Sequence, residues 1–172
     1  MSNEEKPFSI EARYGLLLSI HRAAHFEWIR TIQRLYPECD VGEVVMTYWD
    51  EVARDTAKAY LRVIDRDEPL APQVASLVAR SSVAMGETAA CVTGDEGATV
   101  EHTACPWWNW HQEQGFEALD RPGCDVWFQK VVAYINEAIG SGLRVETHSA
   151  LPDGDPCCRR LITEGRSTQG ST

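Results

Sequence analysis

The sequence has little positive charge and no long apolar run. Its 172 residues hold 16 lysines and arginines against 26 aspartates and glutamates, which gives a formal net charge of −10. Nucleic acid requires a concentrated cationic surface, so this partner is excluded. No stretch approaches the ~20 apolar residues of a membrane span, and the acidic N-terminus lacks the basic and apolar regions of a signal peptide. We therefore predict a cytoplasmic protein with no membrane partner.

Several chemical motifs are also missing. The chain has no Gly-rich phosphate loop and no dinucleotide-binding fingerprint, so we expect no nucleotide cofactor. It has six cysteines, but no two of them have the C-x-x-C spacing of a structural zinc site. Without a secretory signal these cysteines are expected to stay reduced. Each is therefore a packing residue, a metal ligand or a nucleophile.

Helical spacing of apolar residues dominates the first half of the chain. It predicts helices over residues 9–35, 41–64 and 73–83, and a further long helix over residues 124–139. Residues 106–115 are aromatic and irregular, with room for one or two helical turns.

Two hairpins are predicted from short segments that flank turn residues. Residues 85–93 and 98–104 flank the sequence Gly-Asp-Glu-Gly, which is a hairpin signal. Residues 143–150 and 157–163 flank the sequence Pro-Asp-Gly-Asp and predict a second hairpin.

The order of these elements indicates the fold class. Helices come first, followed by hairpin, helix and hairpin, which is typical of an α+β domain. We predict a single domain over residues 1–164, with N-terminal helices packed on an antiparallel sheet of about four strands and one long helix in the C-terminal half. The tail over residues 165–172 has no apolar residue and is expected to be disordered.

The segment over residues 101–111 is the least ordinary part of the sequence. It contains Trp107, Trp108 and Trp110 together with His102, Cys105 and His111. Apolar walls with a few polar groups are typical of small-molecule pockets. The alternative is a hydrophobic plug that closes the end of the sheet, since each tryptophan carries a large apolar area.

Cys124 follows Pro122 and Gly123 and lies near the predicted start of the long helix. The positive end of a helix dipole favours a thiolate, so we expect a lowered pKa for this thiol. The alternative is a residue packed in the core.

The second hairpin carries further candidates. Cys157 and Cys158 are adjacent in a strand and must point to opposite faces, so only one of them can share a site with Cys124. Glu146 and His148 are two residues apart and share a face. They can serve as a ligand pair or a base pair, or they can form an exposed polar stripe.

Together these residues form a possible zinc set of sulfur, nitrogen and oxygen donors. The set is Cys105, Cys124, His148 and one of Cys157 and Cys158, with Glu146 or His111 nearby.

The C-terminal half resembles the L-2-amino-thiazoline-4-carboxylic acid hydrolase family. The resemblance rests on Cys105 before a proline, on Cys124 and the helix after it, and on the sequence Gly-Asp-Pro-Cys-Cys at 154–158. Tyr-Trp-Asp at 48–50 also fits the family. The pattern is distantly similar to vinyl-reductase-like small-molecule-binding domains, which implies helices on an antiparallel sheet.

That distant similarity also implies a zinc site, held by a cysteine, a Glu-x-x-Cys motif and a Gly-Asp-x-x-Cys motif. The matching positions here are Cys124, Glu146 and Cys158, but Ser149 stands where the second motif needs its cysteine. His148 or Cys105 could replace the lost ligand. Otherwise Cys124 is available as a nucleophile.

The resemblance implies a hydrolase that opens a small cyclic amidine or amide-like C–N or C–S bond. One route is attack by a metal-bound water with Glu146 or His148 as base. The other is attack by the thiol of Cys105 or Cys124, activated by a histidine. The candidate histidines are His102, His111 and His148.

The alternative function is a non-enzymatic binding or sensing domain. In that interpretation an apolar ligand lies against Trp107, Trp108 and Trp110, and any zinc is structural. The apolar helices make a homodimer a reasonable prediction for either function.

Overall fold

The computed structural model describes residues 7–165, and the chain divides into two compact units. The first unit ends at Val41, and its described residues contain one helix, α1 (Ile10–Leu35). The Ser9 side chain accepts a hydrogen bond from the Ala12 amide and caps its first turn. The second unit begins at Gly42 and contains the sheet, so the candidate site is described within this unit.

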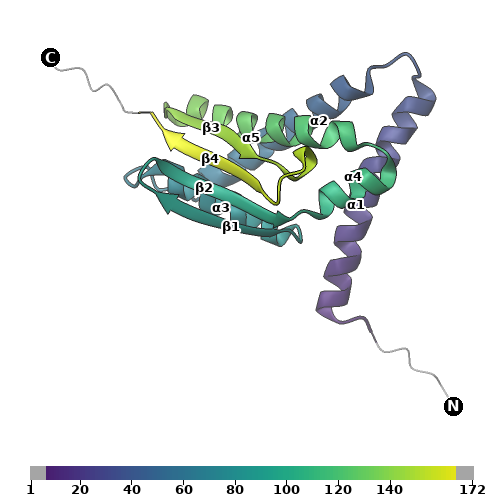
Figure 1. The fold of residues 1–172 in the computed structure, drawn as a ribbon, viewed down its shortest axis with the longest axis horizontal. Coiled ribbons are helices and arrows are strands. Elements are labelled where there is room, and N and C mark those ends of the chain that lie inside the picture. Colours follow the sequence, from purple (N-terminus) through teal and green to yellow (C-terminus); the bar gives the residue numbers. More distant parts are fainter. Residues whose placement is uncertain (1–6, 166–172) are drawn as a thin grey trace. The chain divides into compact units, whose positions relative to one another are not determined.

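The strands of the second unit form one antiparallel sheet in the order β1-β2-β4-β3 (Figure 1). Their bounds are Thr88–Gly94 for β1, Gly97–Ala104 for β2, Leu143–Ser149 for β3 and Cys158–Glu164 for β4. β4 joins the two predicted hairpins, because it pairs with β2 on one side and with β3 on the other. Gly97 is needed in this join, since a Cβ atom there would collide with the backbone of Ile162.

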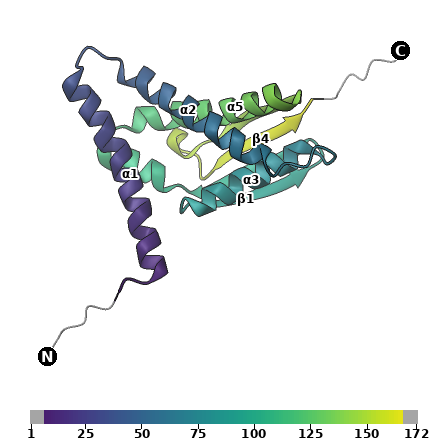
Figure 2. The same ribbon diagram turned by 180° about the vertical axis from the view of Figure 1, so that it is seen from behind.

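The remaining elements of the described part are four α-helices and one short 3₁₀ helix, η1. Their bounds are Val41–Leu61 for α2, Leu70–Ala84 for α3, Pro106–Gln114 for α4, Glu117–Ile139 for α5 and Leu151–Asp153 for η1. α2, α3 and α5 lie on one face of the sheet (Figure 2). This arrangement confirms the predicted α+β class and the four-stranded antiparallel sheet.

The core lies between the sheet and these helices. Val100 and Ile162 project from β2 and β4 toward Ile135 of α5, and all three side chains are fully buried. Each such side chain contributes about 1.5–3 kcal/mol through the apolar surface that it removes from water. Strand residues therefore alternate between this covered face and an exposed outer face, and the alternation decides which polar side chains enter the interior.

The turn from α5 into β3 is held by one side chain. The Asn136 amide nitrogen donates to the Leu143 carbonyl at 2.8 Å, and its oxygen accepts from the Leu143 amide at 2.9 Å. Asn136 thus pairs with both backbone groups of the first β3 residue, as a neighbouring strand would.

The start of α5 differs from the prediction. The helix begins at Glu117, not at residue 124, and continues through Pro122. Pro-Gly normally marks a helix boundary, because proline lacks the amide hydrogen and clashes with the preceding turn. Tertiary packing overrides this signal: Gly123 lies so close to the Trp49 indole of α2 that a Cβ atom would be 2.7 Å from it. The predicted disorder of the tail falls mainly on residues 166–172, which lie outside the described residues.

Candidate active site

A group of polar side chains lies inside the second unit, on the covered face of the sheet. We call Cys105, Cys124, Cys158, His102 and Arg160 the thiol cluster. Phe128 of α5 lies between two members of this cluster. Its ring meets the His102 ring edge-on, with 6.4 Å between the ring centroids. The Arg160 Cζ atom lies 4.5 Å from the centroid of the Phe128 ring. Cys124 is one turn before Phe128 on α5, and Cys158 is paired with His102 across the β2–β4 ladder.

The Cys158 sulfur accepts one hydrogen bond and lies close to a positive charge. The Leu151 amide of η1 donates to Sγ at 3.2 Å, and the charge of the Arg160 guanidinium acts on this side chain. Cys158 is buried, with 8% of its surface exposed. An adjacent arginine is one of the features found around reactive cysteines.

His102 is buried and is held by two residues that come before β1 in the chain. Its Nε2 lies 2.9 Å from Ser82 Oγ and 3.2 Å from Glu87 Oε2. Its Nδ1 is buried and has no hydrogen-bond partner among the residues that the structure describes. One ring nitrogen is therefore paired with a carboxylate, while the other is buried without a partner among the described residues.

Arg160 is the most deeply buried charge of the cluster, with 2% of its surface exposed. Its Nη2 lies 3.3 Å from Asp125 Oδ1. The same oxygen accepts from Thr147 at 2.9 Å, and the other oxygen of Asp125 accepts from Arg121 Nε at 2.6 Å. Arg121 also pairs with Asp153 of η1, so a chain of ion pairs leads from Arg160 to the surface.

The pKa of the Cys124 thiol is raised to about 12, which is opposite to the predicted direction. Burial is the main cause; the positive charge of Arg160 opposes it and the negative charge of Asp120 adds to it. The predicted dipole effect is lost because Cys124 lies well inside α5, beyond the first turn where the helix dipole acts. The pKa of Cys105 is also raised, first by burial and then by the charge of Glu87.

His111 lies outside the thiol cluster and connects two helices. It is 2% exposed, and its Nδ1 lies 2.9 Å from both the Trp107 carbonyl and Asp120 Oδ1. It therefore holds α4 to the first turn of α5. Trp107 packs edge-on against Trp49 of α2 at 5.9 Å, while the three tryptophans of α4 that were predicted to line a pocket are only partly buried.

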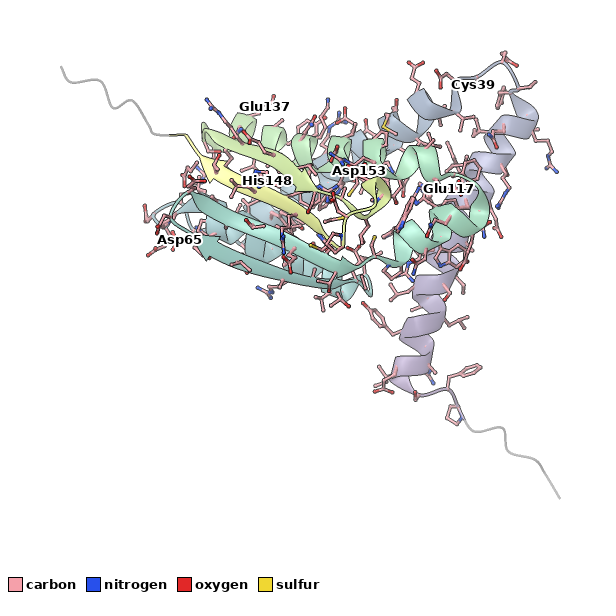
Figure 3. The ribbon with its side chains drawn as sticks, in the orientation of Figure 1. Cys39, Asp65, Glu117, Glu137, His148 and Asp153 are labelled. Atoms are coloured by element: carbon pink, nitrogen blue, oxygen red, sulfur yellow. The ribbon has the colours of Figure 1, made fainter. Side chains whose placement is uncertain are left out.

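Glu146 and His148 lie on the outer face of the sheet and do not meet the cysteines. Their side chains are 73% and 52% exposed, and Glu146 Oε2 and His148 Nε2 are 4.0 Å apart. Figure 3 shows His148 on the uncovered side of the sheet, with the helices behind it. The expected set Cys124, Glu146, His148 and Cys158 is therefore divided between the two faces.

The implied zinc does not fit this arrangement. No group of three or more His, Cys, Asp or Glu residues within residues 7–165 is placed to hold a metal ion. Ser149, which stands in place of the expected cysteine, donates to the Cys157 carbonyl at 2.8 Å and so serves the β3–β4 connection.

Three residues of the site were missed by the sequence analysis: Glu87, Asp125 and Arg160. Arg160 could have been found, because it lies between Cys158 and Ile162 on alternate positions of β4 and must share their buried face. Glu87 and Asp125 give no such signal, since their contacts with His102 and Arg160 join elements that are distant in the sequence.

The fold defines a small α+β domain, with the thiol cluster on the covered face of its sheet. The family model of the L-2-amino-thiazoline-4-carboxylic acid hydrolases matches residues 18–161, and the chain belongs to this family. Membership indicates a small-molecule hydrolase. A search of curated proteins gives no match. Within the described residues, no helix has the length and apolar character needed to cross a membrane.

Proposed function

We propose that this protein hydrolyses a small cyclic amidine of the 2-amino-thiazoline type, with Cys158 as the nucleophile. The proposal rests on the family and on one observation. The Cys158 sulfur accepts from the Leu151 amide, lies close to the Arg160 charge, and neighbours a histidine that is paired with a carboxylate. A nucleophile, a base and a group that orients the base form the usual unit of covalent catalysis.

The choice among the three thiols follows from their surroundings. Burial raises the pKa of Cys124 to about 12 and also raises that of Cys105, so both remain protonated at neutral pH. The thiolate is the nucleophilic form of cysteine, and neither residue supplies it readily. Cys158 is the thiol to which the Leu151 amide donates, at 3.2 Å, and the Arg160 charge also lies close to it. Cys124 then serves as a neutral wall of the site.

His102 is suited to be the base. When Nε2 carries the proton and donates it toward Glu87, Nδ1 keeps its lone pair. Residues paired across antiparallel strands have Cβ atoms about 4.5–5.5 Å apart, which brings an imidazole and a thiol within reach of each other. His102 and Cys158 are such a pair.

The reaction has two stages. The Cys158 sulfur bonds to the amidine carbon, the C–S bond of the ring breaks, and His102 returns the thiol proton to the leaving ring sulfur. Water then bonds to the same carbon and the bond to Cys158 breaks. The net change consumes one water and gives an open-chain ureido compound with a thiol. Glu146 and His148 take no part, because they lie on the other face of the sheet.

The test is turnover of 2-amino-thiazoline-4-carboxylate, followed by mass spectrometry of the ureido product. We expect Cys158→Ser to lower kcat by at least about 10³-fold, since single members of catalytic units have effects of this size. Cys157→Ser is the matched control, because Cys157 is the adjacent buried thiol at the entry to β4, and it should retain activity. His148→Gln should also retain activity.

Full turnover by a folded Cys158→Ser protein would exclude this nucleophile. The same assay on Cys124→Ser and Cys105→Ser then tests the two thiols predicted from the sequence.

A further inference from the structure

The helix α1 has one buried side and a separate apolar side that is exposed. Arg22, His25, Phe26 and Ile29 are buried, and their spacing places them on one side of the helix. Seven large apolar side chains of α1 are about half exposed or more. They are Ile10, Tyr14, Leu16, Leu17, Ile20, Trp28 and Leu35. A helix that is apolar on more than one side is typical of a helix with more than one neighbour, so the exposed side is suited to a second one.

Most of this exposed side follows a heptad repeat. Eight exposed residues are spaced alternately by four and three positions, and we call them the heptad stripe. They are Ile10, Tyr14, Leu17, His21, Ala24, Trp28, Thr31 and Leu35. Six of the eight are apolar, and none is an acid, a lysine or an arginine. A repeat of 3.5 residues keeps an apolar line facing one partner helix along its whole length, so the period indicates a helix as the partner.

The heptad stripe is complementary to itself when two copies of α1 pair antiparallel. A two-fold axis between residues 22 and 23 places Trp28 opposite Leu17 of the second copy, and Tyr14 opposite Thr31. Each of these layers joins a larger side chain to a smaller one, which fills the interface evenly. A parallel pair would place Trp28 on Trp28 and Thr31 on Thr31, so its layers would alternate between crowded and empty. The side chains therefore favour an identical helix in the antiparallel direction.

The exposed apolar surface of α1 is about as large as a stable dimer needs. If a large apolar residue has a total surface of about 200 Å², the exposed fractions of the seven side chains leave roughly 800 Å² uncovered. Stable interfaces bury about 800 Å² per partner. One pair of like charges opposes the pairing, because Arg13 comes near Arg34 of the second copy. Both arginines are exposed, so solvent and salt screen their repulsion.

A lipid surface is the other common neighbour of an exposed apolar helix side. A helix that lies on a membrane needs a charged or polar side in water, opposite its apolar side. In α1 the side away from the heptad stripe carries Phe26 and Ile29, which are 0% and 2% exposed. This favours a helix over a membrane as the second neighbour.

We infer that α1 is the dimer interface of this protein, and that its heptad stripe pairs antiparallel with the heptad stripe of a second copy. The same surface serves on both copies, as a two-fold interface requires. The inference is independent of the proposed reaction, because it uses only residues of the first unit.

Sedimentation velocity on the full chain tests the interface. We expect the wild-type protein to be a dimer at micromolar concentration. Leu17→Lys should raise the Kd of the dimer by about 100-fold or more, because the two-fold symmetry buries the new charge twice. Ser19→Lys is the matched control, since it adds the same charge to the same helix at an exposed position outside the heptad stripe. Its Kd should change by less than about 3-fold, as expected for a surface substitution.

A wild-type protein that stays monomeric at about 100 µM would overturn the inference, because a stable dimer has a much lower Kd. An equal rise in Kd for Leu17→Lys and Ser19→Lys would also overturn it. A monomer that sediments with anionic vesicles would show that a lipid surface covers the heptad stripe instead. If Leu17→Lys does not fold, as judged by circular dichroism, Tyr14→Lys takes its place, since it changes another residue of the heptad stripe.

Disulfide trapping tests the direction of the pair. A mixture of the Leu17→Cys and Trp28→Cys proteins, oxidised in air, should form a disulfide between the two introduced thiols, identified by mass spectrometry of the peptides. The antiparallel register places these two positions in one layer, so this mixed product should exceed the disulfides between identical variants. A preference for disulfides between identical variants would show a parallel pair and overturn the antiparallel register.

Discussion

Individual cysteines of this chain have different chemistry because their surroundings differ. Cys39 is exposed, whereas Cys157 and Cys158 are buried. Cys124 is partly buried against the main core, and the loss of solvent raises its pKa to about 12 in spite of the nearby Arg160 charge. An uncharged thiol is compatible with this interior, and a thiolate at the same place is not.

The raised pKa of Cys124 predicts a loss of stability in alkali. The folded pKa of about 12 exceeds the value of about 8.5 for an unfolded cysteine, so the folded state binds the proton more tightly. The contribution of the protonated Cys124 thiol to the free energy of unfolding is complete below about pH 8.5 and is lost as the pH rises through 12. We expect the free energy of unfolding, measured with urea, to fall more steeply between pH 8.5 and 10.5 for the wild-type protein than for Cys124→Ala. Parallel curves for the two proteins would contradict this.

The sequence indicated much of the site at this scale but placed two residues wrongly. It pointed to Cys124, Cys158 and His102, which the structure brings into one cluster. It also grouped Glu146 and His148 with them. Strand alternation tells which residues share a face but not which face the helices cover, and both side chains lie on the uncovered one.

At the scale of secondary-structure elements, the chain depends on a few side chains that fix how one element follows another. The Asn136 side chain pairs with both backbone groups of Leu143 and also accepts from the Ser141 hydroxyl at 2.7 Å. This arrangement sets the register of β3, the strand that presents Thr147 to Asp125 in the site.

Replacement of Asn136 should therefore loosen the start of β3. Asn136→Ala leaves two backbone groups of Leu143 without their partner. Each unsatisfied buried group costs about 1–3 kcal/mol. We expect a drop of about 2 kcal/mol or more in the free energy of unfolding, measured with urea. The control Ser141→Ala removes a single hydroxyl and should cost less than about 1 kcal/mol. An equal effect of the two changes would show that the Leu143 bonds are unimportant.

The elements themselves were largely predictable, and their boundaries were less so. The period of apolar residues indicated α1, α2 and α3, because it follows directly from the covered face of each helix, and turn residues between short segments indicated both hairpins. α5 was predicted from residue 124, although it begins at Glu117, since the contact between Gly123 and Trp49 joins two elements that are far apart in the sequence.

At the scale of the whole molecule, the chain has two compact units with different content. From residue 7 onward the first unit carries one helix, and the second unit carries the sheet, the thiol cluster and the main core. Every residue of that core cluster lies between Ala53 and Ile162. The hydrophobic stabilisation of the sheet therefore comes from the second unit.

A chain that begins at residue 37 is expected to fold with its sheet intact, because it keeps the whole core cluster and the start of α2. Circular dichroism and a cooperative urea transition would show this, and a non-cooperative transition would contradict it. The predicted homodimer can be tested with the same two proteins. Sedimentation velocity on the full chain and on the shortened chain would also show whether α1 is needed for association.

The bare outer face of the sheet has an evolutionary consequence. Along β4, Cys158, Arg160 and Ile162 are buried while Arg159 is exposed, and along β3 Glu146 and His148 project into solvent. Surface substitutions are usually nearly neutral, whereas changes in the buried set disturb either the core or the site. We therefore expect related proteins to differ mainly at every second position of β3 and β4. The sequence identity among them should rise and fall along these strands with a period of two residues.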